Sequence, residues 1–317
     1  MKRFSAKKIA VAVSGGIDSM ALMHLCARAG VNAIALTVDH GLRATSAADA
    51  LYVAGAAKRL GLRHATLHWT GSKPKTGIEH AAREARYELL AEYCRKHSIT
   101  VLLTAHQADD QIETFLMHLA RGSGAYGLAA IRPVVVREGI TIARPLLDVP
   151  RTELEKYCAT HNIKSVKDEM NEDTDFTRVR IRKNRHLLRD KLGIEDSRIL
   201  IAIDALGRVR DALEQEIENL ISGVIPSDTE SDKTIFPAPF LFDRPLEIQL
   251  KLLSRLVQKI GNATYPPRLE KIQLALDKLK SDTMFTVGRC TLRRLGDKVL
   301  IAPEGTGISF NQKRSKK

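Results

Sequence analysis

The sequence contains little cysteine, with only Cys26, Cys94, Cys158 and Cys290 among its 317 residues. These four are far apart, and none forms a CxxC pair or another spacing typical of metal ligands. The pattern therefore gives no indication of a cysteine-based metal or redox site. It predicts buried thiols in a reducing compartment.

Long apolar runs are also missing. No stretch reaches the roughly 18 apolar residues that a membrane-spanning helix needs. The N-terminal segment MKRFSAKKIAVAVSGG has basic residues and a short apolar run, but this run ends in a glycine turn without a cleavage-type site. We therefore expect a cytoplasmic protein that does not cross a membrane.

Acidic residues are outnumbered by basic ones, 37 against 50, which gives a formal net charge of +13 at pH 7. Such an excess favours a polyanionic partner through counterion release and long-range steering. Nucleic acid is one such partner, but ribosomal and membrane-surface proteins have a similar balance. Charge alone leaves the partner open.

The part of the chain before Pro145 alternates between two kinds of segment. Short β-branched apolar runs are each followed by a segment of helical periodicity. The expected strands are 9–13, 31–38, 64–69 and 100–105, and the expected helices begin at Ser19 or cover 46–60, 78–96 and 109–121. This alternation predicts an α/β fold with a doubly wound parallel sheet.

Three polar loops follow expected strands, at 14–19, 39–43 and 106–110. In doubly wound sheets, ligands bind at the carboxyl ends of the strands. We therefore expect these loops to converge on one crevice.

The second half of the chain has a different pattern. A helix at 150–161, an acidic loop at 168–175 and an arginine-rich helix are expected first, and helical periodicity dominates from Asp196 onward. A hairpin is expected within 285–301, turning at 296–297. We divide the chain into a larger domain at 1–193, a smaller, mainly helical domain at 194–305 and a basic, disordered tail at 306–317.

The first polar loop consists of Ser14, Gly15, Gly16, Ile17, Asp18 and Ser19. It joins a strand to a helix N-terminus, where free N–H groups and the helix dipole favour a phosphate. It has neither the Gly-Lys-Ser/Thr ending of a Walker A loop nor the GxGxxG pattern of dinucleotide folds. It resembles the SGGxDS loop of the PP-loop ATP pyrophosphatases, which implies cleavage of ATP to AMP and pyrophosphate, with adenylation of the substrate.

Further segments resemble the tRNA(Ile)-lysidine synthetases within this superfamily. They are VDHGLR at 38–43, AREARY at 82–87, TAH at 104–106, DDQIET at 109–114, RGSG at 121–124, RPLL at 144–147 and FTR at 176–178. The resemblance covers residues 8 to about 190 and, with one small domain following, implies the shorter form of the family. Val179 and the pair Arg189-Asp190 depart from the family pattern.

The resemblance implies ATP-dependent ligation of free L-lysine to carbon 2 of a cytidine in the anticodon of tRNA(Ile) with a CAU anticodon. Asp18 and Asp110 are the expected Mg²⁺ and phosphate-site carboxylates, because magnesium sites combine one or two carboxylates with phosphate oxygens. Dipole stabilisation is the alternative role of Asp18. Helix capping is the alternative for Asp109 or Asp110.

Three further side chains have implied roles. His106 would contact ATP or the base, although an ordinary core histidine is the alternative. Arg86 resembles the position that closes on the ATP phosphates or the leaving group; a solvated arginine is the alternative. Arg178 matches the family's active-site arginine and shares one helical stripe with Arg182, Arg185 and Arg189, which upstream acidic residues would partly neutralise.

Other hypotheses stay open at this point. A tRNA thiolase shares the loop but needs a sulfur carrier, usually paired cysteines. A small-molecule amide-forming synthetase would be expected to carry a glutamine-hydrolysing domain. A non-catalytic RNA-binding protein would not need Ser14, Asp18 and Ser19 together. The lysine pocket is not defined, although Glu113 is one candidate, and a homodimer is a reasonable expectation.

Overall fold

The computed structural model describes residues 8–42, 45–71, 73–74, 76–166, 177–224, 233–263 and 265–305. Arg43, the expected acidic loop at 168–175 and the tail at 306–317 lie outside these residues. The chain divides into two compact units, Met1–Arg208 and Val209–Lys317, inside helix α9 (Asp196–Val224). The boundary predicted from the sequence lies earlier, at 193/194, in the turn before this helix, and that domain assignment stays a prediction.

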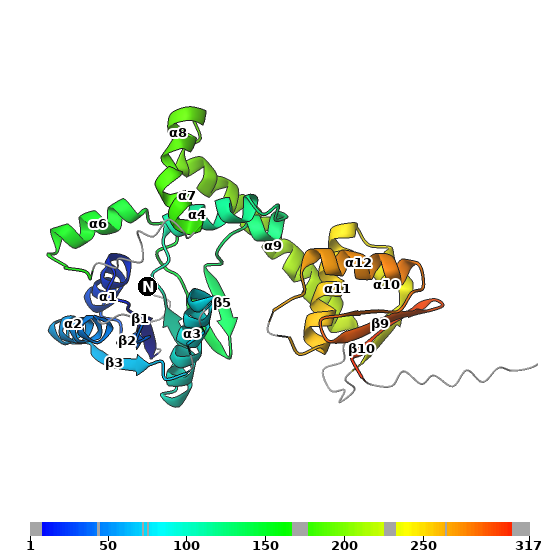
Figure 1. Cartoon of the computed structure of the whole chain (residues 1–317), viewed down its shortest axis with the longest axis horizontal. Helices are drawn as coiled ribbons and strands as arrows, with labels where there is room; N and C mark the ends of the chain where they lie inside the picture. The colour runs from blue at the N-terminus through cyan, green and yellow to red at the C-terminus, as the bar shows by residue number, and fades with distance from the viewer. Residues whose placement is uncertain are drawn as a thin grey trace, which may run out of the picture. The chain divides into compact units, whose positions relative to one another are not determined.

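The first unit is built on a six-stranded sheet with the order β3-β2-β1-β4-β6-β5 (Figure 1). Its strands are β1 (Ile9–Ala12), β2 (Ala33–Asp39), β3 (Arg63–His68), β4 (Val101–Leu103), β5 (Val134–Arg137) and β6 (Ile140–Ala143). All neighbouring pairs are parallel except β5 and β6. The predicted doubly wound parallel sheet is confirmed, and the β5–β6 hairpin at its edge was not predicted.

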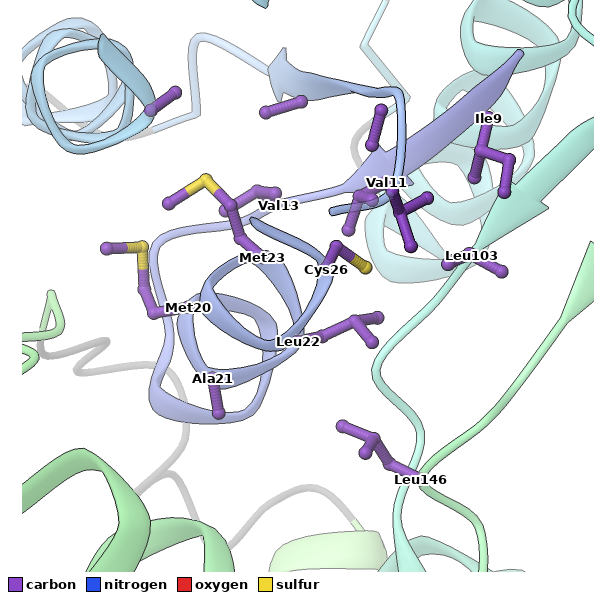
Figure 2. Packing of buried hydrophobic residues seen from close by; sticks show 14 of the residues in the cluster. Ile9, Val11, Val13, Met20, Ala21, Leu22, Met23, Cys26, Leu103 and Leu146 are labelled. Carbon is purple, nitrogen blue, oxygen red and sulfur yellow. The ribbon is translucent and has the colours of Figure 1, made fainter. Parts of the chain in front are cut away.

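Strand β1 is buried on both faces, as its continuous apolar sequence requires. Ile9 and Val11 pack in the cluster on one face, and Ala10 packs in the cluster on the other. The first cluster includes side chains of the helices α1 (Ile17–Arg28), α2 (Ser46–Arg59) and α6 (Arg151–Thr160), and the second those of α3 (Ile78–Lys96). Figure 2 shows the residues of α1 beside those of β1.

The helices that connect β1 to β2 and β3 to β4 pack on opposite faces of the sheet. The chain passes from β1 through α1 to β2, and from β3 through α3 on the opposite face to β4, which is the other neighbour of β1. The carboxyl ends of β1 and β4 therefore flank the switch point of the sheet, where ligands bind in this class of fold.

A group of helices follows β4 and β6. They are α4 (Ala108–Leu119), α5 (Ala125–Leu128), α7 (Thr177–Asn184), α8 (His186–Leu192) and the start of α9. Ile112 of α4 packs against Ile199 and Ile203 of α9 in a small core of its own. The single arginine-rich helix that the sequence suggested is two helices, α7 and α8, separated at Arg185.

The second unit contains a four-stranded antiparallel sheet with the order β7-β10-β9-β8. Its strands are β7 (Thr234–Pro237), β8 (Phe285–Val287), β9 (Cys290–Leu295) and β10 (Lys298–Pro303), and its helices after α9 are α10 (Ala238–Phe242), α11 (Leu246–Ile260) and α12 (Leu269–Lys280). The expected hairpin is the β9–β10 pair, and β7 and β8 extend it to a sheet. Within the described ranges, no helix of either unit is long and apolar enough to cross a membrane.

The packing of α1 on β1 yields a stability prediction. Leu22 is fully buried beneath the sheet, so Leu22→Ala should lower the free energy of unfolding by about 2–5 kcal/mol through lost burial and a cavity. Leu51→Ala on α2, where the side chain is 74% exposed, should change it by less than about 0.5 kcal/mol. Urea unfolding followed by circular dichroism makes the comparison, and equal midpoints for the two variants would contradict this packing.

Candidate active site at the carboxyl ends of the strands

The glycine turn lies between β1 and α1 and is held by its own hydroxyl groups. The Oγ of Ser19 accepts a hydrogen bond from the Ser14 N–H at 3.2 Å and donates one to the Gly16 carbonyl oxygen at 2.9 Å. Gly16 is the N-cap residue of α1, and no side chain of the described residues caps the helix there. The first-turn N–H groups of α1, at Ile17 and Asp18, are thus available to an anion.

Gly15 is required at its position for two reasons. Its φ of +89° lies in the left-handed region, and a Cβ atom would be 3.1 Å from Cγ2 of Val166. The Val166 N–H also donates to the Gly15 carbonyl oxygen at 2.9 Å. The turn is therefore fixed from outside by the chain that follows α6.

Asp18, in the first turn of α1, carries a carboxylate in an unfavourable environment. Its Oδ1 is buried and has no hydrogen-bond partner among the residues that the structure describes. Burial raises its pKa to about 6; Arg151 lowers it, and the carboxylates of Asp110 and Asp109 raise it further. Asp18 therefore belongs to an acidic group that a cation would stabilise.

The adjacent Asp109 and Asp110 point to different partners. Oδ2 of Asp110 accepts from the Gln107 N–H at 3.1 Å in a capping box, and its Oδ1 lies 3.5 Å from Nη2 of Arg178. Burial raises the pKa of Asp110, although Arg178 lowers it. Asp109 instead contacts Arg185 and the backbone of Arg151. Asp110 is thus the carboxylate on the Arg178 side, and it caps α4 as well.

Glu113 neutralises much of the arginine stripe. Its side chain is completely buried; Nε of Arg182 donates to Oε1 at 2.7 Å, and Nη2 donates to Oε2 at 3.2 Å. Nε of Arg178 lies 2.8 Å from Oε2, which makes an ion pair without the alignment of a hydrogen bond. Arg189 leaves the stripe and pairs with Asp190 on the surface. Glu113 is therefore the charge partner of Arg178 and Arg182.

His106 follows β4 and lies in a strongly positive environment. Its Nδ1 is 3.0 Å from Oγ1 of Thr104. Burial lowers its pKa to about 3, and the guanidinium groups of Arg144, Arg83 and Arg86 lower it further. The imidazole is therefore neutral at working pH.

The guanidinium groups near His106 also gather around Tyr87 of α3, which is 4% exposed. The guanidinium carbons of Arg83 and Arg86 each lie 5.3 Å from the ring centroid, and that of Arg137 lies at 5.0 Å. Burial lowers the pKa of Arg86, with Arg83 and Arg178 acting in the same direction and Tyr87 opposing it. Arg137 is already paired with Glu84 at 2.7 Å. An anion beside Arg83 and Arg86 would relieve their mutual repulsion.

The loop after β2 reaches the same region. Oδ1 of Asp39 accepts from the Gly41 N–H at 2.8 Å. Nδ1 of His40 is buried without a partner in the described part of the chain, and burial and Arg86 both lower the pKa of this histidine. The described parts of the three predicted loops therefore lie at one edge of the sheet, where the parallel strands β1, β2 and β4 end, and we refer to this region as the predicted crevice.

Comparison with known proteins decides the family. A family model described as a PP-loop domain matches residues 1–188. The tRNA(Ile)-lysidine synthase of Bradyrhizobium diazoefficiens is 41% identical over 87% of this chain and 79% of its own length. That of Rhodopseudomonas palustris is 38% identical over 94% of this chain and 91% of its own. The chain belongs to the tRNA(Ile)-lysidine synthase family.

A likeness to one solved structure concerns the fold alone. The U34-tRNA thiolase NcsA from Methanococcus maripaludis aligns with a TM-score of 0.52 and 16% identity, over 66% of this chain and 72% of its own. All four cysteines of the present chain are free, buried thiols, and Cys26, Cys94 and Cys290 have a pKa raised to about 11 by burial. The tRNA(Ile)-lysidine synthase family is therefore favoured over the thiolase alternative.

Several side chains at this crevice have no specific role in the sequence-based prediction. Arg144 and Tyr87 lie within segments that resemble the lysidine synthetases, but no property of those segments indicates that the two side chains interact or that Arg144 lies near His106. Glu113 was considered only as a lysine ligand. The signal that could have identified it is its i,i+4 spacing from Asp109 and i,i+3 spacing from Asp110, which gathers three carboxylates on one side of α4.

The raised pKa of Asp18 predicts a pH-dependent gain in stability for Asp18→Asn. Between its ordinary value of 3.8 and about 6, the folded state holds a proton that the unfolded chain has lost, so this group lowers stability as pH rises through that window. At pH 7.5 the free energy of unfolding of the variant should be about 1 kcal/mol higher than that of the wild type, a value reduced because solvent screens part of the effect of the pKa shift. Below about pH 4 the difference should vanish. Thermal melts across this range measure it, and a pH-independent difference would contradict the assignment.

Proposed function

We propose that this chain ligates free L-lysine to carbon 2 of the anticodon wobble cytidine of tRNA(Ile) with a CAU anticodon, converting ATP to AMP and pyrophosphate. Family membership supports the reaction class. The observation that carries the proposal for these residues is the meeting, at one switch point, of a glycine turn, an acidic group and an excess of guanidinium groups.

The glycine turn and the arginine side chains of the predicted crevice suit different parts of the ATP molecule. The turn at 14–19 offers backbone N–H groups to the β and γ phosphates, as the family resemblance implies. Arg86 lies where positive charge is in excess, and Arg178, whose charge Glu113 and Asp110 partly offset, lies near it. Both would stabilise charge that develops on the α-phosphate and on the departing AMP. His106, being neutral, can donate or accept a hydrogen bond to ATP or the base without adding charge.

The proposed chemistry has two steps. The carbonyl oxygen at position 2 of cytosine attacks the α-phosphorus, forming a P–O bond and breaking the bond to pyrophosphate. The neutral amine of the lysine side chain then attacks carbon 2; the C–O bond breaks, AMP leaves, and the amine loses a proton.

Magnesium fits the acidic side of the crevice. The buried, unpartnered Oδ1 of Asp18 is an oxygen of the kind that Mg²⁺ prefers, and Asp110 is the second carboxylate that we propose for it. No group of three or more His, Cys, Asp or Glu side chains is placed for a metal in the described ranges. Bound Mg²⁺ would neutralise phosphate charge.

We further propose a cytoplasmic location and, on general grounds of symmetry, a homodimer.

The reaction itself can be tested directly. Purified protein is incubated with ATP, magnesium, radiolabelled lysine and an unmodified tRNA(Ile) transcript, and label on the RNA is counted. Label should require ATP and vanish when the anticodon cytidine is replaced. Release of AMP without lysine transfer would indicate another nucleophile, and no ATP consumption would favour a non-catalytic RNA-binding protein.

Arg178→Ala should reduce the rate of the chemical step by roughly 100- to 1000-fold while leaving tRNA affinity nearly unchanged, because its charge is proposed to act on the transition state. Arg180→Ala, on the exposed side of the same helix, removes the same charge away from Glu113 and serves as the control. Single-turnover kinetics separate the two effects. If Arg178→Ala weakened only tRNA binding, Arg178 would be a phosphate anchor instead.

A further inference from the structure

Asp109 and Asp110 are adjacent acidic residues at the start of α4, yet they do different things. Only Asp110 lies near Arg178. We propose that Asp109 is a positioning residue: through Arg185 it holds the α7–α8 segment against α4, so that Arg178 stays at the crevice, and it does not bind magnesium or phosphate itself.

The contacts of Asp109 are with Arg185 and Arg151, not with Arg178. Its Oδ2 accepts from Nη2 of Arg185 at 2.8 Å, and its Oδ1 accepts from the backbone N–H of Arg151 at 3.3 Å. Arg151 is the first residue of α6, so one carboxylate joins the starts of α4 and α6 to the junction of α7 and α8. Both oxygens are therefore already engaged by the fold.

Arg185 lies at the point where α7 ends and α8 begins. Arg178 is seven residues earlier, two helical turns away on the same face of α7. Glu113 therefore holds the first part of α7 through Arg178 and Arg182, and Asp109 holds its end through Arg185. With two fixed points on one short helix, the direction of the Arg178 side chain is set by both.

Charge and burial make the Asp109 contact hard to replace. The side chains of Arg185 and Asp109 are 19% and 21% exposed, and Nη1 of Arg185 is buried with no partner in the part of the chain that the structure describes. The other carboxylate near Arg185 is Asp196, at 3.2 Å and 51% exposed. Loss of Asp109 would leave a poorly compensated buried cation, which favours movement of the α7–α8 junction toward water.

The same carboxylate also reaches the acidic side of the site. The guanidinium of Arg151 lowers the pKa of Asp18, and the Arg151 backbone is anchored by Asp109. A displacement of about 1 Å in groups that position a reaction can reduce its rate roughly 100-fold. Asp109 can thus influence catalysis without contact with any substrate.

A double-mutant cycle tests this role, which rests on the proposed lysine ligation. Asp109→Asn keeps an oxygen for the Arg151 N–H but removes the ion pair, and Arg185→Gln removes it from the other side. Each should lower kcat for lysine transfer by roughly 10- to 100-fold, with the KM for ATP and the magnesium concentration for half-maximal rate unchanged. The double variant should be no slower than the slower single variant.

The matched control is Asp190→Asn, which removes an exposed ion pair between Asp190 and Arg189 on α8 and should leave the rate unchanged. A higher magnesium requirement in Asp109→Asn alone would make Asp109 a metal ligand and overturn the proposal. Rate losses of the two single variants that multiply in the double variant would overturn it as well. So would single variants that are as fast as the wild type.

Hydrogen exchange of the α7 backbone amides gives a readout that does not depend on activity. Asp109→Asn and Arg185→Gln should increase exchange in α7 to the same extent, and Asp190→Asn should not. Unchanged protection would contradict the positioning role even if the rates fell. A wild-type protein that transfers no lysine would refute the proposed function, and the exchange cycle would still decide whether Asp109 holds α7.

Discussion

The parallel pairing of β1 with β2 on one side and β4 on the other is the constraint on which the site depends. β1 is four residues long and buried on both faces. The helix that connects β1 to β2 packs on one face of the sheet, and the helix that leads to β4 packs on the other. Helices therefore pack on both faces of the sheet, and the edge where β1 and β4 end is its switch point. The glycine turn, His106 and the start of α4 all lie at that edge because their strands end there.

Charge is distributed across this edge in an ordered way. Acidic side chains come from the first turn of α1 and from α4, whereas guanidinium groups come from α3, the end of β6 and α7. Glu113 and Asp109 offset part of the positive charge within the fold. Arg83, Arg86 and Arg144 instead lie near His106 and lower the pKa of its imidazole. The depressed pKa of Arg86 and the raised pKa of Asp18 have the same main cause, because burial disfavours the charged form of each group.

Local patterns in the sequence predicted the strands and helices of the first unit well, because each is buried on a regular period. Because the ends of the strands could be located, the polar loops that follow them could be predicted as well. The β5–β6 hairpin was missed, although Glu138-Gly139 between two β-branched runs is a turn signal, and both residues have positive φ. The arginine stripe was recognised on one helix, but the break at Arg185 turns Arg189 away. Pairings such as Arg182 with Glu113, 69 residues apart, and Arg185 with Asp109, 76 residues apart, depend on tertiary packing that no local period encodes.

The hydrogen bond from Val166 to Gly15 links the glycine turn to the chain that leaves α6. Thermodynamic linkage makes such a contact reciprocal: if phosphate binding changes the free energy of the bond, forming the bond changes phosphate affinity by the same amount. Tyr52 of α2 ties this chain down as well, since its hydroxyl donates to the Lys164 carbonyl oxygen at 2.8 Å. If the two are coupled in this way, occupancy of the turn and order in residues 163–166 are two measures of one equilibrium, and a probe placed on either would report on the other.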